Sequence, residues 1–178
     1  MRRNVMECTK IIINLLKDAY AMEEAIIEIL EQHASDTEDT DIKLRLEEKM
    51  ESVSFQAEKT KQRVEELGDE VSTAKTGLAN IIKNMEEYPI GFERGKIIKD
   101  TIIEYGTEYI QKATYKAILT AAEECKDEQT AELCEEIIGD EREASEYLDQ
   151  NLAGVVIDYV NHETVEKKNI NYTGDDEI

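Results

Sequence analysis

The chain has 178 residues, of which 35% are charged, and its net charge is −21. This charge excludes nucleic acid and anionic membranes as partners, because phosphate binding needs clustered lysine and arginine. No apolar run approaches the roughly 20 residues of a membrane-spanning helix, and we expect no signal peptide behind the basic start of the chain. A single proline, no tryptophan and 40% hydrophobic residues indicate long helices around one core.

The three cysteines, Cys8, Cys125 and Cys134, are an odd number and lack CxxC spacing. This usage is typical of reduced thiols, so we interpret the protein as cytoplasmic. A bond between Cys125 and Cys134, which flank a predicted turn, is the alternative.

The first half of the chain predicts two long antiparallel helices. In residues 3–33, Leu16, Ala19, Ile26 and Leu30 recur at helical spacing on one face. Residues 34–40, ASDTEDT, are rich in residues that cap helix N-termini and indicate a turn. A second helix is expected over residues 41–67, ended by Gly68. The short link predicts a helical hairpin.

The second half predicts another hairpin, from helices over residues 96–125 and 129–161. Between the hairpins, residues 71–85 predict a short helix, and residues 88–95, YPIGFERG, predict a loop. The expected fold is therefore an all-α four-helix bundle of two antiparallel hairpins, joined by a long crossover with a short extra helix. We expect residues 1–162 to form the bundle and residues 163–178 to be a flexible acidic tail.

Glutamates stand at corresponding heights in the four long helices. Glu23 interrupts the apolar face of the first helix, and Glu141 interrupts that of the last. Glu58 lies at the edge of the second apolar face, and Glu108 lies on a mixed face of the third helix. Folding each hairpin brings Glu23 level with Glu58 and Glu108 level with Glu141. Four converging acids need a cation, a metal ion or shared protons, because like charges otherwise repel strongly.

The stretches around these acids read DAYAMEE, QAEKTKQRVEEL, TEYIQKATY and ELCEEIIGDE, with AKTGL between the second and third. Together they resemble the ferritin-like family of YciF-type bacterial stress-associated proteins, over roughly residues 12–153. Family members carry D-x-Y-x-x-E, E-x-T-H, and E-H-Y-E followed by a tyrosine. The resemblance implies a ferritin-like four-helix bundle with a carboxylate metal site.

The resemblance places the metal-binding glutamates of the family on Glu23, Glu58, Glu108 and Glu141. Two companion positions differ, because Lys61 replaces the family histidine and Gln111 replaces an acid. A third, Ala144, stands where ferritin-like sites often place a second ligand. The two histidines of the chain do not follow a glutamate at i+3, and we expect one of them, His33, to be a cap or surface residue. Such sites normally use about six ligands.

Two functions follow from this altered ligand set. The favoured one is a stress-associated bundle with a partly degenerate metal site, in which Lys61 and Gln111 satisfy the glutamates and no residue is assigned a catalytic role. The alternative is a working di-iron or di-manganese carboxylate protein with peroxide- or oxygen-linked redox activity. The cofactor is accordingly Fe or Mn, or none. The expected partner is a second copy of the chain, bound through a helix face. A plain coiled-coil adaptor is disfavoured, because the apolar positions do not follow heptads.

Overall fold

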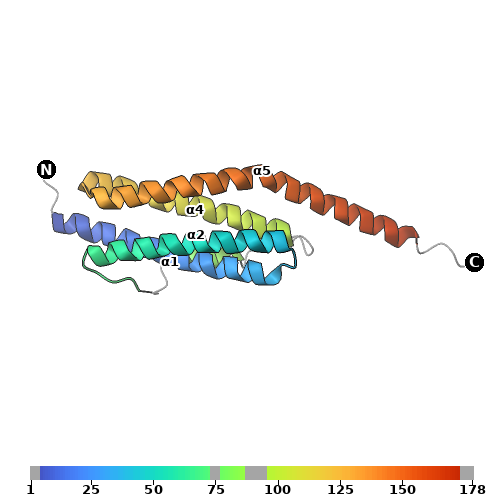
Figure 1. Ribbon diagram of the computed structural model, residues 1–178, viewed down its shortest axis with the longest axis horizontal. Helices are drawn as coiled ribbons and strands as arrows, with labels where there is room; N and C mark the ends of the chain where they lie inside the picture. The colour runs from blue at the N-terminus through green and yellow to red at the C-terminus, as the bar shows by residue number, and fades with distance from the viewer. Residues whose placement is uncertain (1–4, 73–76, 87–95, 173–178) are drawn as a thin grey trace, which may run out of the picture.

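The computed structural model is a bundle of long α-helices (Figure 1). It describes residues 5–72, 77–86 and 96–172, and for some residues of the last helix, including 141–145, it describes the backbone alone. The helices in this described part are α1 (Val5–Asp36), α2 (Thr40–Glu66), α3 (Gly77–Glu86), α4 (Lys96–Cys125) and α5 (Glu128–Tyr172). The loop predicted over residues 88–95 lies outside the described residues.

Both ends of α2 are set by local hydrogen bonds that the sequence anticipates. The Asp39 side chain accepts hydrogen bonds from the backbone N–H groups of Asp41 and Ile42, as a helix N-cap does. At the other end Gly68 has a φ of +87°, and its N–H donates to the carbonyl of Glu65. The left-handed conformation favours glycine, and here it ends the helix.

The turn between α4 and α5 repeats this geometry without a glycine. Lys126 has a φ of +61°, and its N–H donates to the carbonyl of Glu123. The next residue, Asp127, accepts a hydrogen bond from the backbone N–H of Thr130 and caps α5. The turn therefore contains one strained residue beside a strong cap.

The helices are arranged as two hairpins that pack side by side. α1 packs against α2, and α4 packs against α5, while α1 also contacts α4 and α2 contacts α5. The order around the bundle is therefore α1, α2, α5, α4, and α2 and α4 face each other diagonally across its interior. The short helix α3 lies mainly against α1. The predicted all-α four-helix bundle with an extra helix in the crossover is confirmed.

The core is formed by apolar side chains from all four long helices. Those that are at most 1% exposed include Leu16, Ile26, Val53, Val64, Ile118 and Ile137. Burying each such side chain contributes roughly 1.5–3 kcal/mol. Polar groups admitted to this core must therefore be held by specific partners.

The last helix continues beyond its predicted end. α5 runs to Tyr172 rather than to residue 161, so the tail predicted from residue 163 begins inside a helix. No glycine or proline occurs between Gly154 and Gly174, and glutamate and lysine are good helix formers. A polar sequence alone therefore does not end the helix after residue 161.

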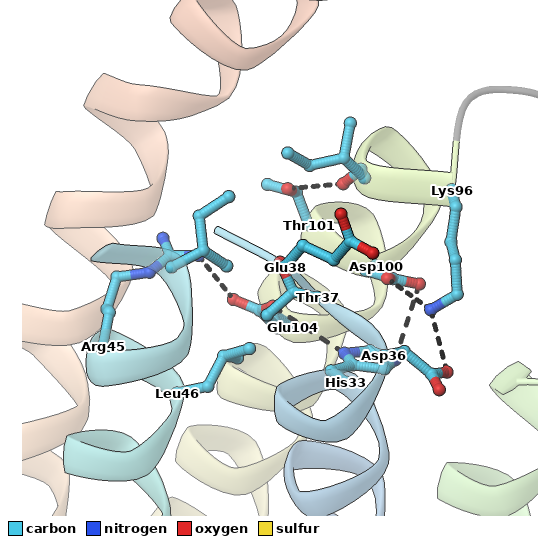
Figure 2. A pocket seen from close by; sticks show the side chains of 12 residues that line it. His33, Asp36, Thr37, Glu38, Arg45, Leu46, Lys96, Asp100, Thr101 and Glu104 are labelled. Atoms are coloured by element: carbon cyan, nitrogen blue, oxygen red, sulfur yellow. Dashed lines mark hydrogen bonds and ion pairs between the residues drawn. The ribbon is translucent and has the colours of Figure 1, made fainter. Parts of the chain in front are cut away.

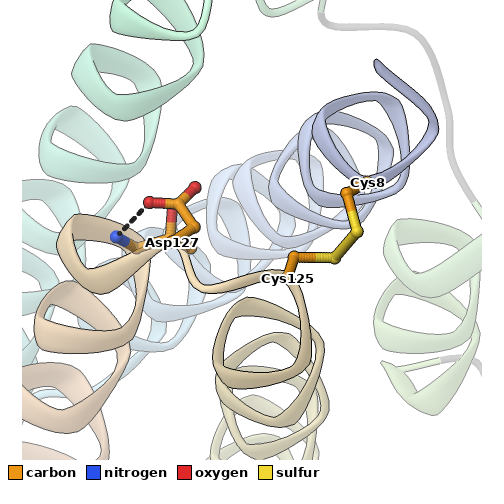
Figure 3. Close-up of a disulfide and its surroundings, with 4 residues drawn as sticks. Cys8, Cys125 and Asp127 are labelled. Atoms are coloured by element: carbon orange, nitrogen blue, oxygen red, sulfur yellow. Dashed lines mark hydrogen bonds between the residues drawn. A yellow bond between two sulfur atoms is a disulfide. The ribbon is translucent and has the colours of Figure 1, made fainter. Parts of the chain in front are cut away.

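The prediction that all three cysteines are reduced is wrong for two of them. Cys8 and Cys125 form a disulfide with a Cα–Cα distance of 5.7 Å (Figure 3), within the usual range. Cys134 is a free thiol and is buried, so the alternative bond between Cys125 and Cys134 is also wrong. The prediction failed because the antiparallel packing of α1 on α4 brings together residues 117 positions apart.

Candidate functional site

A hydrogen-bonded chain of three side chains lies in the middle of the bundle. Glu23 of α1, Thr60 of α2 and Tyr115 of α4 are each completely buried. The Tyr115 hydroxyl donates a short hydrogen bond to Glu23 Oε1. Because the Tyr115 hydroxyl proton is used in that bond, the Thr60 hydroxyl donates to the Tyr115 oxygen, at 2.7 Å. The predicted inward position of Glu23 is confirmed, and a phenol is one of its partners.

The next layer joins two amide side chains across the same diagonal. Gln111 is fully buried, and its Nε2 donates to Gln56 Oε1 at 2.7 Å. We expected Gln111 to bond a glutamate, and instead it bonds another neutral amide. The Gln111 Oε1 atom has no hydrogen-bond partner among the described residues.

A third layer pairs a buried acid with a lysine. Glu108 of α4 is 4% exposed, and its Oε1 lies 2.8 Å from Lys49 Nζ of α2. The lysine side chain is 19% exposed, so most of it is removed from solvent. A cation supplied by the chain itself therefore balances this acid.

These layers continue to one end of the bundle, where His33 lies between two carboxylates (Figure 2). Its Nε2 is 3.6 Å from Asp100 Oδ1, and its Nδ1 is 3.8 Å from Glu104 Oε1. Arg45 Nη2 is 3.5 Å from Glu104, and Lys96 Nζ is 3.0 Å from Asp100. These groups border a cavity of about 210 Å³. His33 is 2% exposed, so the expected cap or surface role is wrong, because α4 covers the end of α1.

At the opposite end, Arg63 of α2 joins the turn before α5. Its guanidinium donates to Asp127 Oδ1 at 2.7 Å, to Gln129 Oε1 at 2.8 Å and to Thr130 Oγ1 at 2.9 Å. Asp127 also caps α5, so one acid joins the helix end to the arginine.

The polar pairs between α2 and α4 form a row along the interior of the bundle, which we call the polar column. Its pairs are Arg45–Glu104, Lys49–Glu108, Gln56–Gln111 and Thr60–Tyr115.

Glu58 lies on the outer surface of α2 and does not meet Glu23. Its side chain is 68% exposed, and it pairs with Lys61 Nζ at 3.2 Å along the same helix. Two residues of an α-helix turn through roughly 200°, so the inward positions of Gln56 and Thr60 direct Glu58 outward. The expected role of Lys61 as the cation at mid-bundle is therefore wrong, and Lys49 has that place.

The described donors do not fit a two-metal carboxylate centre. Within the described part of the chain, no three His, Cys, Asp or Glu side chains are grouped so that they could hold a metal ion. Of the two inward acids, Glu23 accepts from a phenol and Glu108 pairs with an ammonium group, and the positions beside them hold amides. The Glu141 and Ala144 side chains lie outside the described residues. Metal binding by Glu23, Glu108 and Glu141 stays a prediction, and Glu58 faces away from such a site.

Burial changes the proton affinity of two groups in this interior. The pKa of Tyr115 is held well above its ordinary value, first by burial and then by the charge and hydrogen bond of Glu23. Burial, with a smaller contribution from Asp127, raises the pKa of Cys134 to about 12. Both groups therefore stay protonated in the folded protein at neutral pH.

The sequence analysis missed Lys49, Gln56 and Thr60, which build the α2 side of the polar column. Polar residues on α2 are numerous, and glutamates drew attention because metal sites use them. A usable signal was present, since Val53, Gln56, Thr60 and Val64 follow helical spacing.

The solved structures with a similar fold include ferritin-like proteins. A protein from Xanthomonas campestris pv. campestris is 25% identical, with a TM-score of 0.74, over 88% of this chain and 99% of that one. The Escherichia coli stress protein YciF is 18% identical, with a TM-score of 0.70, over 87% and 98% of the two chains. The Desulfovibrio desulfuricans bacterioferritin, described with a diiron site, is 24% identical, with a TM-score of 0.69, over 86% and 85%. No curated protein matches the sequence.

The fold and the buried acids thus define a ferritin-like helical bundle protein. The family model described as a domain of unknown function, DUF892, matches residues 7–161, and the chain belongs to that family. The YciF-type ferritin-like family predicted from the sequence is confirmed. No helix in the described part of the chain is long and apolar enough to cross a membrane.

Proposed function

We propose that this protein is a non-catalytic ferritin-like bundle whose carboxylate site has become a structural polar core. The observation that carries the proposal is the 2.8 Å ion pair between Glu108 and Lys49. In this core a lysine balances one acid and a tyrosine hydroxyl binds the other. At Glu108 the lysine replaces the charge that a metal would supply, and at Glu23 the hydroxyl replaces one of the bonds.

The energetics of buried polar groups support this role. A buried carboxylate is costly unless it is paired, and removing one partner of a buried pair costs about 3–5 kcal/mol. The column places such pairs between diagonal helices, so it fixes their register. We expect the protein to act as a stable scaffold in a stress-associated setting, as YciF is a stress protein by description.

The alternative function is a metal protein that uses Glu23, Glu108 and Glu141, with Fe or Mn. It is supported by the inward position of the first two acids and by the diiron description of the bacterioferritin. It requires the Lys49 ammonium group to leave Glu108. The cytoplasmic location also stays a proposal, and the disulfide removes the argument from reduced thiols.

Two lysine variants test the structural role. Lys49→Met keeps the length of the side chain but leaves Glu108 without its ammonium partner, so we expect it to lower the free energy of unfolding by about 3 kcal/mol. The control is Lys61→Met, which breaks the surface pair with Glu58 and should change stability by no more than about 0.5 kcal/mol. Urea denaturation of both variants gives the comparison. Equal effects would contradict a structural polar core.

A further inference from the structure

An open groove lies where α1, α3 and α4 meet, and it is separate from the polar column. It has a volume of about 360 Å³. Its walls are mainly apolar, and they include Leu15 of α1, Leu78 of α3, and Ile110 and Ile118 of α4. No residue of the polar column borders it. The groove is therefore a concave surface with its own environment.

The shape of the groove follows from how α3 meets α4. At Gly106 of α4 the two helices approach closely, since a Cβ atom there would lie 2.5 Å from the Met85 Cε atom. Ala113 and Ala117, roughly two and three turns further along α4, border the groove with small side chains. Met85 lies near the end of α3, and Leu78 lies near its start. The helices therefore touch at Gly106, and the space beside the two alanines stays open.

The carboxylate of Asp18, on α1, is the single charged group in the lining of the groove. The side chain is partly buried, and no residue in the described part of the chain forms a hydrogen bond or an ion pair with it. The neighbouring Lys17 is used elsewhere, since its Nζ lies 2.8 Å from Asp69 Oδ1. The hydroxyl of Thr114, which also lines the groove, donates to the carbonyl of Ile110 at 2.8 Å. Because a charge in apolar surroundings is stabilised by an opposite charge, Asp18 provides a site for a cation.

Asp18 does not belong to the buried acids of the core, although it begins the DAYAMEE stretch that contains Glu23. Five residues of an α-helix turn through roughly 500°, so the two side chains project in directions about 140° apart. Glu23 is completely buried against Tyr115, whereas Asp18 lies in the groove beside α3. A structural role of the core therefore does not account for Asp18.

The size and the chemistry of the groove indicate its ligand. Pockets for small molecules have volumes of roughly 300–1,000 Å³ and combine apolar walls with a few polar groups. A single carboxylate matches a single positive charge, and the net charge of −21 disfavours anionic ligands. The apolar walls offer few hydrogen-bonding partners to a hydrated metal ion. The complementary molecule is an organic amine with an apolar body.

We propose that this groove binds a small organic cation, with its ammonium group on the Asp18 carboxylate and its apolar body between Leu78 and Ile118. The ammonium group donates charge-assisted hydrogen bonds to the carboxylate. The apolar body covers the walls that α3 and α4 leave open. The site is separate from the polar column, so it does not depend on the structural role of the core.

The first test is the affinity of the full chain for 1-naphthylmethylamine, measured by isothermal titration calorimetry. We expect one molecule bound per chain. Binding should be about tenfold weaker for 1-naphthylmethanol, which has the same ring but no charge. Equal affinities for the amine and the alcohol would overturn Asp18 as the partner of the ligand. A natural chain that showed no saturable binding of the amine would overturn the site.

Matched variants separate the groove from the general attraction of an acidic chain for cations. Asp18→Asn should weaken binding of the amine about tenfold. Asp140→Asn, which removes an exposed acid of α5, should leave the affinity unchanged. Ala117→Leu should abolish binding, because the larger side chain fills the groove, and leucine is a good helix former. Urea denaturation shows that each variant is folded. Equal losses in the two aspartate variants, or full binding by Ala117→Leu, would overturn the groove as the binding site.

Discussion

The buried acids of this bundle are stabilised by partners that differ in kind. Glu23 accepts a hydrogen bond from the Tyr115 phenol, whereas Glu108 forms an ion pair with Lys49. A phenol keeps its proton, so it bonds the carboxylate without cancelling its charge. An ammonium group cancels the charge but loses solvation on burial. The two kinds of partner together let one core hold acids from the neighbouring helices α1 and α4.

Replacing Tyr115 with phenylalanine tests the contribution of its hydrogen bond to Glu23. The variant removes the hydrogen bond to Glu23, and we expect it to lower the free energy of unfolding by about 2 kcal/mol at pH 7. It should also change the dependence of stability on pH. The pKa of Tyr115 is raised in the folded state from an ordinary value of 10.0, so above pH 10 only the unfolded chain loses this proton.

The natural chain should therefore lose about 1.4 kcal/mol of stability from this group for each pH unit above 10. Tyr115→Phe should lack that part of the slope. Urea denaturation at pH 9, 10 and 11 gives both curves. Parallel curves would show that the pKa of Tyr115 is unchanged by folding.

Whether a residue faces the core could be predicted where the sequence pattern was simple. Glu23 was identified because it interrupts a continuous apolar face, and the structure buries it completely. Glu58 was placed at the edge of such a face, and there a shift of one residue in the helix rotation decides between core and solvent. Lys49 could not be identified, because its partner lies 59 residues away on a diagonal helix.

At the scale of helices, two connections end a helix with a left-handed residue, and they differ in its type. Gly68 adopts its φ of +87° without strain, whereas Lys126 has a φ of +61°. A side chain in this region costs roughly 1–2 kcal/mol. Lys126→Gly should therefore raise the free energy of unfolding by about 1 kcal/mol.

The opposite substitution, Gly68→Ala, should lower stability by about 1 kcal/mol, for the same reason. A Cβ atom at Gly68 meets nothing within 4 Å, so the effect would be conformational rather than steric. Thermal and urea denaturation of both variants measure the pair. Changes of the same sign would contradict this explanation of the turns.

The helices themselves were predictable because their caps and apolar spacing are local. The structure has α4 at Lys96–Cys125, as expected, and α2 within one residue at each end. The end of α5 was missed because a polar sequence was interpreted as unstructured, although nothing in residues 155–173 breaks a helix. Which elements pack together depends on distant contacts, and the Cys8–Cys125 bond is the clearest example.

At the scale of the whole molecule, the disulfide and the polar column act on different helix pairs. The disulfide joins the start of α1 to the end of α4, and the column joins α2 from Arg45 to Thr60 with α4 from Glu104 to Tyr115. α4 is thus held from two sides, while α5 is held by packing, by the Arg63 cluster and by the bonds of Glu136 to Lys59 and of Asp149 to Tyr105. A chain with a net charge of −21 benefits from such specific ties, because its overall charge opposes compactness.

The central claim is that this core is complete without metal, and unfolding with and without metal tests it most directly. The measurement is the free energy of unfolding of the full chain in chelator, compared with the same chain in anaerobic Fe(II) or in Mn(II). A metal that bound the folded chain would raise this free energy by about 2.7 kcal/mol at a concentration 100 times its dissociation constant. We predict no increase with either metal. An increase that Glu23→Gln abolished would contradict the account and would support the carboxylate metal site.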